Sequence, residues 1–442
     1  MKIEQFYDEN LAHASYAILS ENEMAVIDPA RNPHQYYEYA EKYNASIIAI
    51  IETHPHADFV SSHVEISKKT GANIYVSSLL NPLYEYTSFD EGDEISIGKI
   101  KLKSLNTPGH SPDSISVIIQ DENGKDYALA SGDTLFIGDV GRPDLRENVG
   151  AVQSARENLA KMMYESINKK ILKLDDDMLV YPAHGAGSLC GKALSKERVS
   201  TIGKQKKENY ALQPMKEEEF VKELLKDQPM IPKYFGHSVE LNRKGAPDFK
   251  TSVDSVSIID KNSALDANTL VIDTRDKNDY AAGHLSGSIN IPDSKSFETW
   301  LGSIVAPDEQ FYMICESEDK CKELIERSAK IGYEGLIKSA LLNPDNANQK
   351  SIELDSSLFK SNTDNYNIVD VRNPGERNDR VIFEDSSHIP LHQLRERVSE
   401  INTDKPVVLH CAGGMRSAIA QSILQDKVNV DVYDLGEKVK EY

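Results

Sequence analysis

The chain has 442 residues, too many for one ordinary hydrophobic core, so we expect two to four domains. Its formal net charge of −21 opposes contact with nucleic-acid phosphates, and no basic patch offsets that charge, which excludes nucleic acid as a partner. No stretch approaches the roughly 18 apolar residues of a membrane span, and the first residues lack the apolar core of a signal peptide. We therefore expect a cytoplasmic protein that does not enter a membrane, with reduced thiols at Cys190, Cys315, Cys321 and Cys411.

The first half of the chain alternates apolar stretches with polar turns and helical spacing. Helical spacing over 34–45 and 151–178 predicts helices. Strands are predicted wherever apolar residues run together or alternate with polar ones, within 16–30, 46–54, 68–78, 95–111, 113–136 and 178–187. From about 194 to 250 the chain is charged and carries four prolines, which indicates a helical extension and linker.

The remainder contains an internal repeat. An Asp-x-Arg sequence begins at Asp273 and again at Asp370, and a strand ending in cysteine follows each, at Cys315 and Cys411. A spacing of about 96 residues predicts two tandem α/β units. We therefore expect three domains, over 1–250, 251–350 and 351–442.

Ligand-type residues follow several of the predicted strands in the first domain. The motif "THPHADF" contributes three of them, and the later motifs "TPGHS", "SGDTLF" and "YPAHG" contribute one each. Scattered structural histidines and a turn aspartate are the plainer alternative. Imidazole and carboxylate groups that recur in this way after strands favour a metal site built from His54, His56, Asp58, His110, Asp133 and His184.

These motifs resemble the metallo-β-lactamase superfamily, over about residues 1–250. The resemblance implies an αββα sandwich. In hydrolytic members such as glyoxalase II, a histidine directly follows the motif's aspartate and helps to hold a second metal ion. Here Phe59 follows Asp58, so the second site has lost a ligand. The family pattern therefore implies one ion with vacant positions; simple core packing by Phe59 is compatible with this.

Within the superfamily, the segment "GDVGRPD" at 138–144 is similar to the persulfide dioxygenases, which bind a single iron. Carried over by position, that resemblance implies Fe(II), one ion in the N-terminal domain, held by His54, His110 and Asp133. Such a set leaves open positions where a persulfide and O2 can meet, and iron, unlike zinc, can pass electrons between them. The remaining polar groups would surround the ion or the substrate: His56, Asp58, His184, Arg142 and Cys190.

Arg142 and Cys190 each have a plainer alternative. Arg142 could hold a substrate carboxylate, fix Asp144, or form an ordinary surface ion pair. Cys190 could be a small packing residue or a thiol that receives or relays sulfur near the metal. Glycines on both sides of Cys190 favour the second role.

The segment "VVLHCAGGMRSAIAQSIL" places Cys411 at the end of an apolar strand and at the start of a tight loop. The glycines let backbone N–H groups point inward, and the following helix and Arg416 add positive potential, all of which favour a thiolate. A buried structural cysteine would need none of these. The loop resembles the rhodanese active site, which implies a persulfide on Cys411 surrounded by Ala412, Gly413, Gly414, Met415 and Ser417.

The middle copy matches the rhodanese framework, but its loop, "CESEDKCK", contains no glycine. Glu316, Glu318 and Asp319 should raise the pKa of Cys315 and repel anions, while Lys320 replaces the arginine. We expect this copy to be weakly active or inactive, a spacer or docking surface. Cys321 is expected to be a packing or surface thiol.

Together the resemblances imply a persulfide dioxygenase fused to one degenerate and one active rhodanese domain. A low-molecular-weight thiol persulfide and O2 would give sulfite, which would take sulfur from Cys411 as thiosulfate; the reverse flow uses the same residues. Three alternatives remain open: a zinc-dependent thioester hydrolase, a sulfur carrier without oxygenase activity, and a cysteine phosphatase. Related enzymes imply a homodimer or homotetramer.

Overall fold

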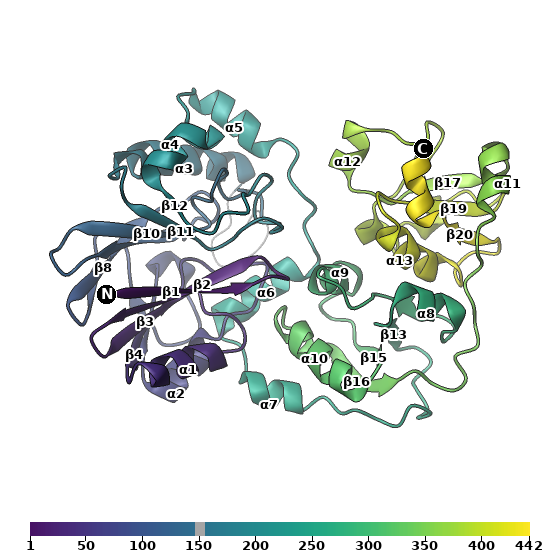
Figure 1. The fold of residues 1–442 in the computed structure, drawn as a ribbon, viewed down its shortest axis with the longest axis horizontal. Helices are drawn as coiled ribbons and strands as arrows, with labels where there is room; N and C mark the ends of the chain where they lie inside the picture. Colours follow the sequence, from purple (N-terminus) through teal and green to yellow (C-terminus); the bar gives the residue numbers. More distant parts are fainter. Residues whose placement is uncertain (146–154) are drawn as a thin grey trace. The chain divides into compact units, whose positions relative to one another are not determined.

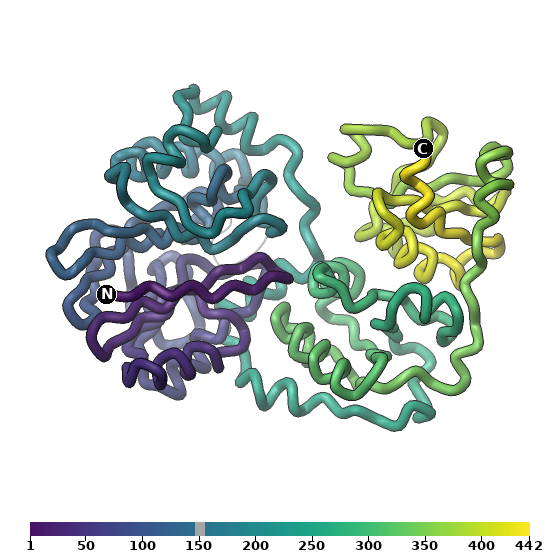
Figure 2. Tube along the Cα trace, viewed as in Figure 1, coloured from purple at the N-terminus to yellow at the C-terminus, as the bar shows by residue number. Residues whose placement is uncertain are grey.

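The computed structural model describes residues 1–145 and 155–442, and divides into two compact units. The first comprises Met1–Thr251 with Ala329–Gly332, and the second comprises Ser252–Ser328 with Tyr333–Tyr442. Figure 2 follows the chain from its purple N-terminus to its yellow C-terminus. No helix among the described residues is long and apolar enough to cross a membrane.

The first unit contains two six-stranded sheets. One has the order β1-β2-β3-β4-β5-β6, with strands Lys2–Asp8, His13–Ser20, Glu23–Ile27, Ser46–Ile51, Asn73–Val76 and Thr87–Ser88. The other has the order β12-β11-β10-β9-β8-β7, with strands (from β7) Glu94–Ile97, Ile100–Asn106, Ile115–Gln120, Asp126–Gly132, Leu179–Pro182 and Ser200–Thr201. Both sheets are mixed, because β3 to β6 pair in parallel, as do β10 and β11.

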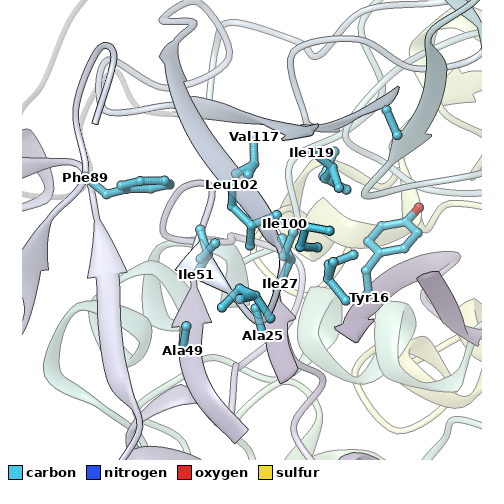
Figure 3. Close-up of a cluster of buried hydrophobic side chains, with 14 of the residues drawn as sticks. Tyr16, Ala25, Ile27, Ala49, Ile51, Phe89, Ile100, Leu102, Val117 and Ile119 are labelled. Carbon is cyan, nitrogen blue, oxygen red and sulfur yellow. The ribbon is translucent and has the colours of Figure 1, made fainter. Parts of the chain in front are cut away.

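The two sheets enclose the main core of this unit. Apolar side chains from both sheets meet there, including Ile27, Ile51, Leu102 and Val117 (Figure 3). Full burial of each such side chain stabilises the fold by about 1.5–3 kcal/mol. Separate clusters lie on the outer faces, where the helices pack: α1 His34–Lys42 and α2 His63–Thr70 on one, α3 Arg156–Lys169 and α5 Glu217–Leu225 on the other (Figure 1). The predicted αββα sandwich is confirmed.

Two sequence-based expectations for this unit need adjustment. The helix expected over 151–178 is α3, which ends at Lys169; residues 151–154 lie outside the described residues. The segment 194–250 is integrated into the unit, since β12 joins the second sheet and Phe220 of α5 is fully buried. Its helices α4 and α6 are Ile202–Glu208 and Tyr234–Lys244, and α7, Phe249–Asp254, crosses the boundary in sequence to the second unit.

The second unit contains the two repeats, each a four-stranded parallel sheet. The first has the order β14-β13-β15-β16, with β13 Leu270–Asp273, β14 Ile289–Asn290, β15 Phe311–Cys315 and β16 Ile337–Leu342. The second has the order β18-β17-β19-β20, with β17 Asn367–Asp370, β18 Ser387–His388, β19 Val407–His410 and β20 Val432–Asp434. Their helices are α8 Lys277–Ala282, α9 Phe297–Ile304, α10 Glu318–Ala329, α11 Ser356–Ser361, α12 Pro374–Asp379 and α13 Met415–Leu424.

The two repeats contact each other within this unit. Ser422 of α13 accepts a hydrogen bond from the backbone N–H of Asn290, at 2.9 Å. Arg395 forms a two-pronged ion pair with Glu309, with both distances 2.7 Å. The middle repeat thus supports α13, the helix that follows Cys411 in the chain.

Candidate metal centre and sulfur-transfer loop

Three predicted ligands, His54, His110 and Asp133, meet in the first unit. His54 lies shortly after β4, His110 after β8, and Asp133 directly after β10. All three are buried, and their ligand atoms lie within 4.8 Å of one another. Nε2 of His54 is 3.8 Å and Nε2 of His110 is 3.4 Å from Oδ2 of Asp133. Strands from both sheets therefore bring two imidazoles to one carboxylate.

Hydrogen bonds on the far side of each imidazole fix its orientation. Nδ1 of His110 donates to the carbonyl oxygen of Arg142 at 2.8 Å. Thr53 donates its hydroxyl proton to Asp28 at 2.8 Å, so it accepts from Nδ1 of His54 at 3.0 Å. Both rings thus present an unprotonated Nε2, the form that binds a metal ion.

A glycine permits this close arrangement. A Cβ atom at Gly141 would meet the backbone oxygen of Asp133 and lie 2.9 Å from Cβ of His110. Any larger residue would displace both ligand-bearing loops. Gly141 belongs to the "GDVGRPD" segment, so this segment supports the ligand group directly.

A second group, His56, Asp58 and His184, adjoins the first. Nε2 of His184 lies 3.3 Å from Oδ2 of Asp58 and 3.5 Å from Oδ1 of Asp133. Within the described residues, neither carboxylate oxygen of Asp58 nor Nε2 of His184 has a hydrogen-bond partner, although all are buried. Buried polar groups without partners are costly, and a bound cation would satisfy them. The donor set therefore fits a metal ion.

Phe59 is buried beside this second group. Its ring stacks on His13 at 3.7 Å between ring centroids and lies 4.3 Å from His56. Position 59 therefore supplies an apolar ring, and no donor atom, beside this group. His13, at the start of β2, has no place in the sequence-based site, because a single histidine in an apolar strand looks like ordinary core.

His56 faces a buried acidic pair that no sequence motif marks. Its Nε2 is 3.1 Å from Oδ1 of Asp28 and 3.8 Å from Oε2 of Glu52. Burial alone would lower the pKa of His56, but these carboxylates raise it to about 9. Burial raises the pKa of Glu52 to about 8. Both acids directly follow apolar strands, the same signal that identified Asp133.

Arg142 and Cys190 border the site. Arg142 is 1% exposed and pairs with both oxygens of Asp144 at 2.7 Å, so the surface-pair alternative is wrong. Its backbone N–H donates to the carbonyl oxygen of Cys190 at 2.9 Å. The Cys190 thiol belongs to a further group with Asp133 and His184, whose ligand atoms lie within 4.8 Å. Burial raises the pKa of Cys190 well above its ordinary value, and the carboxylate of Asp58 adds to this.

The loop after β19 surrounds Cys411. The backbone N–H of Gly414 donates to its sulfur at 3.1 Å, and the hydroxyl of Ser417 lies 3.4 Å away. Gly414 has a φ of +91°, a conformation that favours glycine. Arg416 pairs with both oxygens of Glu376, at 2.5 and 2.7 Å, so its charge is partly neutralised and does not act alone on the loop.

The corresponding loop after β15 differs. Lys320 pairs with Asp293 at 2.8 Å and with Glu323 at 2.9 Å. The pKa of Cys315 is raised as expected, but the chief causes are the thiol of Cys321 and burial, not the acidic loop. Cys321 is fully buried, which excludes the surface alternative.

Comparisons with known proteins agree with this architecture. The model of the metallo-beta-lactamase superfamily matches residues 9–184, and that of the rhodanese-like domain matches 258–339 and 355–442. The chain therefore belongs to the metallo-beta-lactamase superfamily and carries two rhodanese-like domains.

Particular relatives refine this description. A probable metallo-hydrolase of Bacillus subtilis, YqgX, is 30% identical over 39% of this chain and 84% of its own length. The persulfide dioxygenase ETHE1 of Mus musculus is 26% identical, and the match covers 40% of this chain and 64% of the mouse protein. A crystal structure of a metallo-beta-lactamase from Staphylococcus aureus superposes with a TM-score of 0.69 at 34% identity, over 77% of this chain and 98% of that one.

Proposed function

We propose that this protein is a non-haem iron persulfide dioxygenase coupled to a sulfurtransferase. The overall oxidation converts one thiol persulfide, one O2 and one water into the free thiol and sulfurous acid, which ionises to sulfite. The observation that carries this proposal is the meeting of two histidines and one carboxylate, His54, His110 and Asp133, with the apolar ring of Phe59 beside His56 of the adjoining group. Similarity to persulfide dioxygenases supports it.

In this proposal His54 and His110 hold iron through Nε2, and Asp133 holds it through a carboxylate oxygen. Bound Fe(II) would supply the electron transfer between the persulfide sulfur and O2. Thr53 and the carbonyl of Arg142 keep both rings in the ligating tautomer. Asp28 lies 3.1 Å from Nε2 of His56 and raises the pKa of that imidazole, which supports a role for His56 outside the ligand set.

Cys411 would carry the second reaction. Its persulfide, Cys411-S-SH, transfers the outer sulfur to sulfite, which yields thiosulfate and returns the Cys411 thiol. The Gly414 N–H hydrogen bond stabilises the thiolate that leaves. Joining both domains in one chain raises the effective concentration of each product at the next site.

One observation favours a second candidate, a zinc-dependent thioester hydrolase. Asp58 and His184, which would bind a second ion, are both present, and the carboxylate oxygens of Asp58 and Nε2 of His184 lack hydrogen-bond partners in the described part of the chain. The absence of a ligand at Phe59 counts against a complete second site.

Metal exchange separates the two candidates. Protein stripped with a chelator would be reloaded anaerobically with Fe(II) or Zn(II), then given a thiol persulfide or an acyl thioester. We expect sulfite only with Fe(II) and O2, and no thioester cleavage with either metal. Thioester cleavage by the zinc form without O2 would favour the hydrolase.

A further inference from the structure

The tandem repeat places a second cysteine beside the nucleophile position of the middle copy. Cys315 ends β15 as Cys411 follows β19, and α10 follows Cys315 as α13 follows Cys411. Cys321 follows Cys315 at the same interval as Ser417 follows Cys411. The hydroxyl that faces the sulfur in the C-terminal copy is therefore replaced by a thiol in the middle copy.

Contacts within the middle copy agree with this correspondence. Ser417 Oγ lies 3.4 Å from the sulfur of Cys411. In the middle copy, Cys321 Sγ lies 3.9 Å from the carbonyl oxygen of Leu341, the residue that pairs with Ile314 next to Cys315 in the sheet. The two thiols lie close enough for each to shift the pKa of the other. Both cysteines are fully buried, much as Cys411 is at 1% exposure.

The two thiols differ in acidity. The hydrogen bond from Cys321, together with burial, raises the pKa of Cys315. The hydrogen bond from Cys315 lowers the pKa of Cys321. Of the two thiols, Cys321 is therefore the more acidic. A thiolate, and not a thiol, attacks sulfur.

We propose that Cys315 and Cys321 form a dithiol that thiol persulfides oxidise to an intramolecular disulfide. A cysteine thiolate attacks the outer sulfur of R-S-SH, which forms a cysteine persulfide and releases R-SH. The second cysteine attacks the inner sulfur of that persulfide, which forms the disulfide and releases hydrogen sulfide. The sum is R-S-SH plus two cysteine thiols giving R-SH, hydrogen sulfide and one disulfide: two thiols are oxidised, and the sulfane sulfur is reduced to sulfide.

The surroundings of the pair favour an internal acceptor over an external one. Glu316, Glu318 and Asp319 are exposed in the loop that follows Cys315, and their charges oppose most strongly a small dianion such as sulfite. Lys320, at the position of Arg416, is bound to acidic side chains. The C-terminal copy would transfer its sulfur to an external acceptor. The middle copy would instead release the sulfur as sulfide, and its own two thiols would be oxidised.

The test uses the full chain with its metal, kept anaerobic so that no persulfide is consumed by oxygenation. The protein is treated with glutathione persulfide, alkylated without reduction, and digested with trypsin. Cleavage after Lys320 separates the two cysteines, so the Ser296–Lys320 peptide stays joined to Cys321–Lys322 only through a disulfide. We expect the two peptides to be joined until dithiothreitol is added. We also expect one more sulfide released per chain than from the Cys321→Ser variant.

Matched variants make the result specific. Cys321→Ser should remove both the joined peptides and the additional sulfide, and leave Cys315 as a thiol or persulfide. Ser417→Cys should create the same disulfide with Cys411 and make sulfurtransferase activity fall at least tenfold after persulfide treatment, with recovery on reduction. Separate peptides from the wild-type protein, whether alkylated at both thiols or carrying a stable persulfide, would overturn the proposal.

Discussion

At the scale of single residues, position 59 decides whether the group around Asp58 and His184 gains a further donor atom. The Phe59 ring stacks on His13 and contacts His56, and it offers no donor atom next to Asp58 and His184. A histidine there would complete a second set of nitrogen and oxygen ligands. The choice of an apolar ring therefore bears on which chemistry the domain can perform.

Replacing Phe59 by histidine should raise the metal content of the first unit from one ion to two, and should lower persulfide oxidation by roughly tenfold or more, since open positions are lost. Elemental analysis and sulfite production measure the two effects. Phe59→Leu, which adds no ligand, should keep one ion. A single ion in the histidine variant would contradict this role for Phe59.

His410 provides a pH-dependent term in the second unit. Burial lowers its pKa to about 4, despite Asp370 at 3.9 Å. The unfolded chain, with a histidine pKa of about 6.5, then binds more protons than the folded chain below that pH. The contribution of His410 to the free energy of unfolding is therefore complete above about pH 6.5, and it falls towards pH 4 by at most about 1.4 kcal/mol per pH unit. Trp300, the only tryptophan, lies in this unit, and its fluorescence can follow urea unfolding. His410→Gln should flatten the decline; an identical decline would refute the assignment.

At the scale of elements, the Cys411 loop depends on one glycine more than on the other. A Cβ at Gly414 would lie 2.9 Å from the backbone carbon of Gly436, and its φ of +91° disfavours other residues. A Cβ at Gly413 would lie within 4 Å of no atom of the described residues outside its chain neighbours.

We therefore expect Gly414→Ala to lower sulfurtransferase activity by more than about tenfold and to destabilise the unit by about 1–3 kcal/mol. Gly413→Ala should change both much less. A thiosulfate-to-acceptor assay and unfolding curves for both variants check this expectation. Equal effects of the two substitutions would show that loop conformation at Gly414 is not decisive.

Helix α6 supports the ligand-bearing loop after β4. Asn242 donates to the carbonyl oxygens of His56 and Phe59, both at 2.8 Å, and accepts from the N–H of Ser61 at 2.7 Å. Asn242→Leu would leave these buried groups unpaired. Each unpaired group lowers the stability of the fold by about 1–3 kcal/mol before the structure relaxes. We expect a lower melting temperature and faster metal loss to a chelator. Lys244→Ala, an exposed change on the same helix, should alter neither.

At the scale of the whole molecule, the domain types could be predicted because each has motifs at strand ends. His54, His110 and Asp133 follow apolar strands, so their meeting could be anticipated. Asp28 and Glu52 follow strands as well, but isolated acids there are common and no motif marks them. The role of 194–250 could not be anticipated, because charge and proline suggest a linker while the few apolar residues that pack, such as Phe220, are sparse in the sequence.

The coupling of the two activities predicts a change of product. Cys411→Ser should leave persulfide oxidation by the first unit unchanged, but sulfite should accumulate where the intact chain forms thiosulfate, because no persulfide can form on serine. Ion chromatography of the reaction mixture distinguishes the two anions. Undiminished thiosulfate from the serine variant would assign sulfur transfer to another thiol, such as Cys190.

The measurement that tests the central claim most directly is oxygen uptake by Fe(II)-loaded protein given a thiol persulfide. We predict rapid oxygen uptake, with one persulfide sulfur oxidised for each O2 consumed. In His110→Ala the rate of uptake should fall by at least about a hundredfold, since one of three ligands disappears. Cys411→Ser should retain the uptake. Iron-loaded protein that consumes no oxygen, or that consumes it equally without His110, would contradict the dioxygenase assignment.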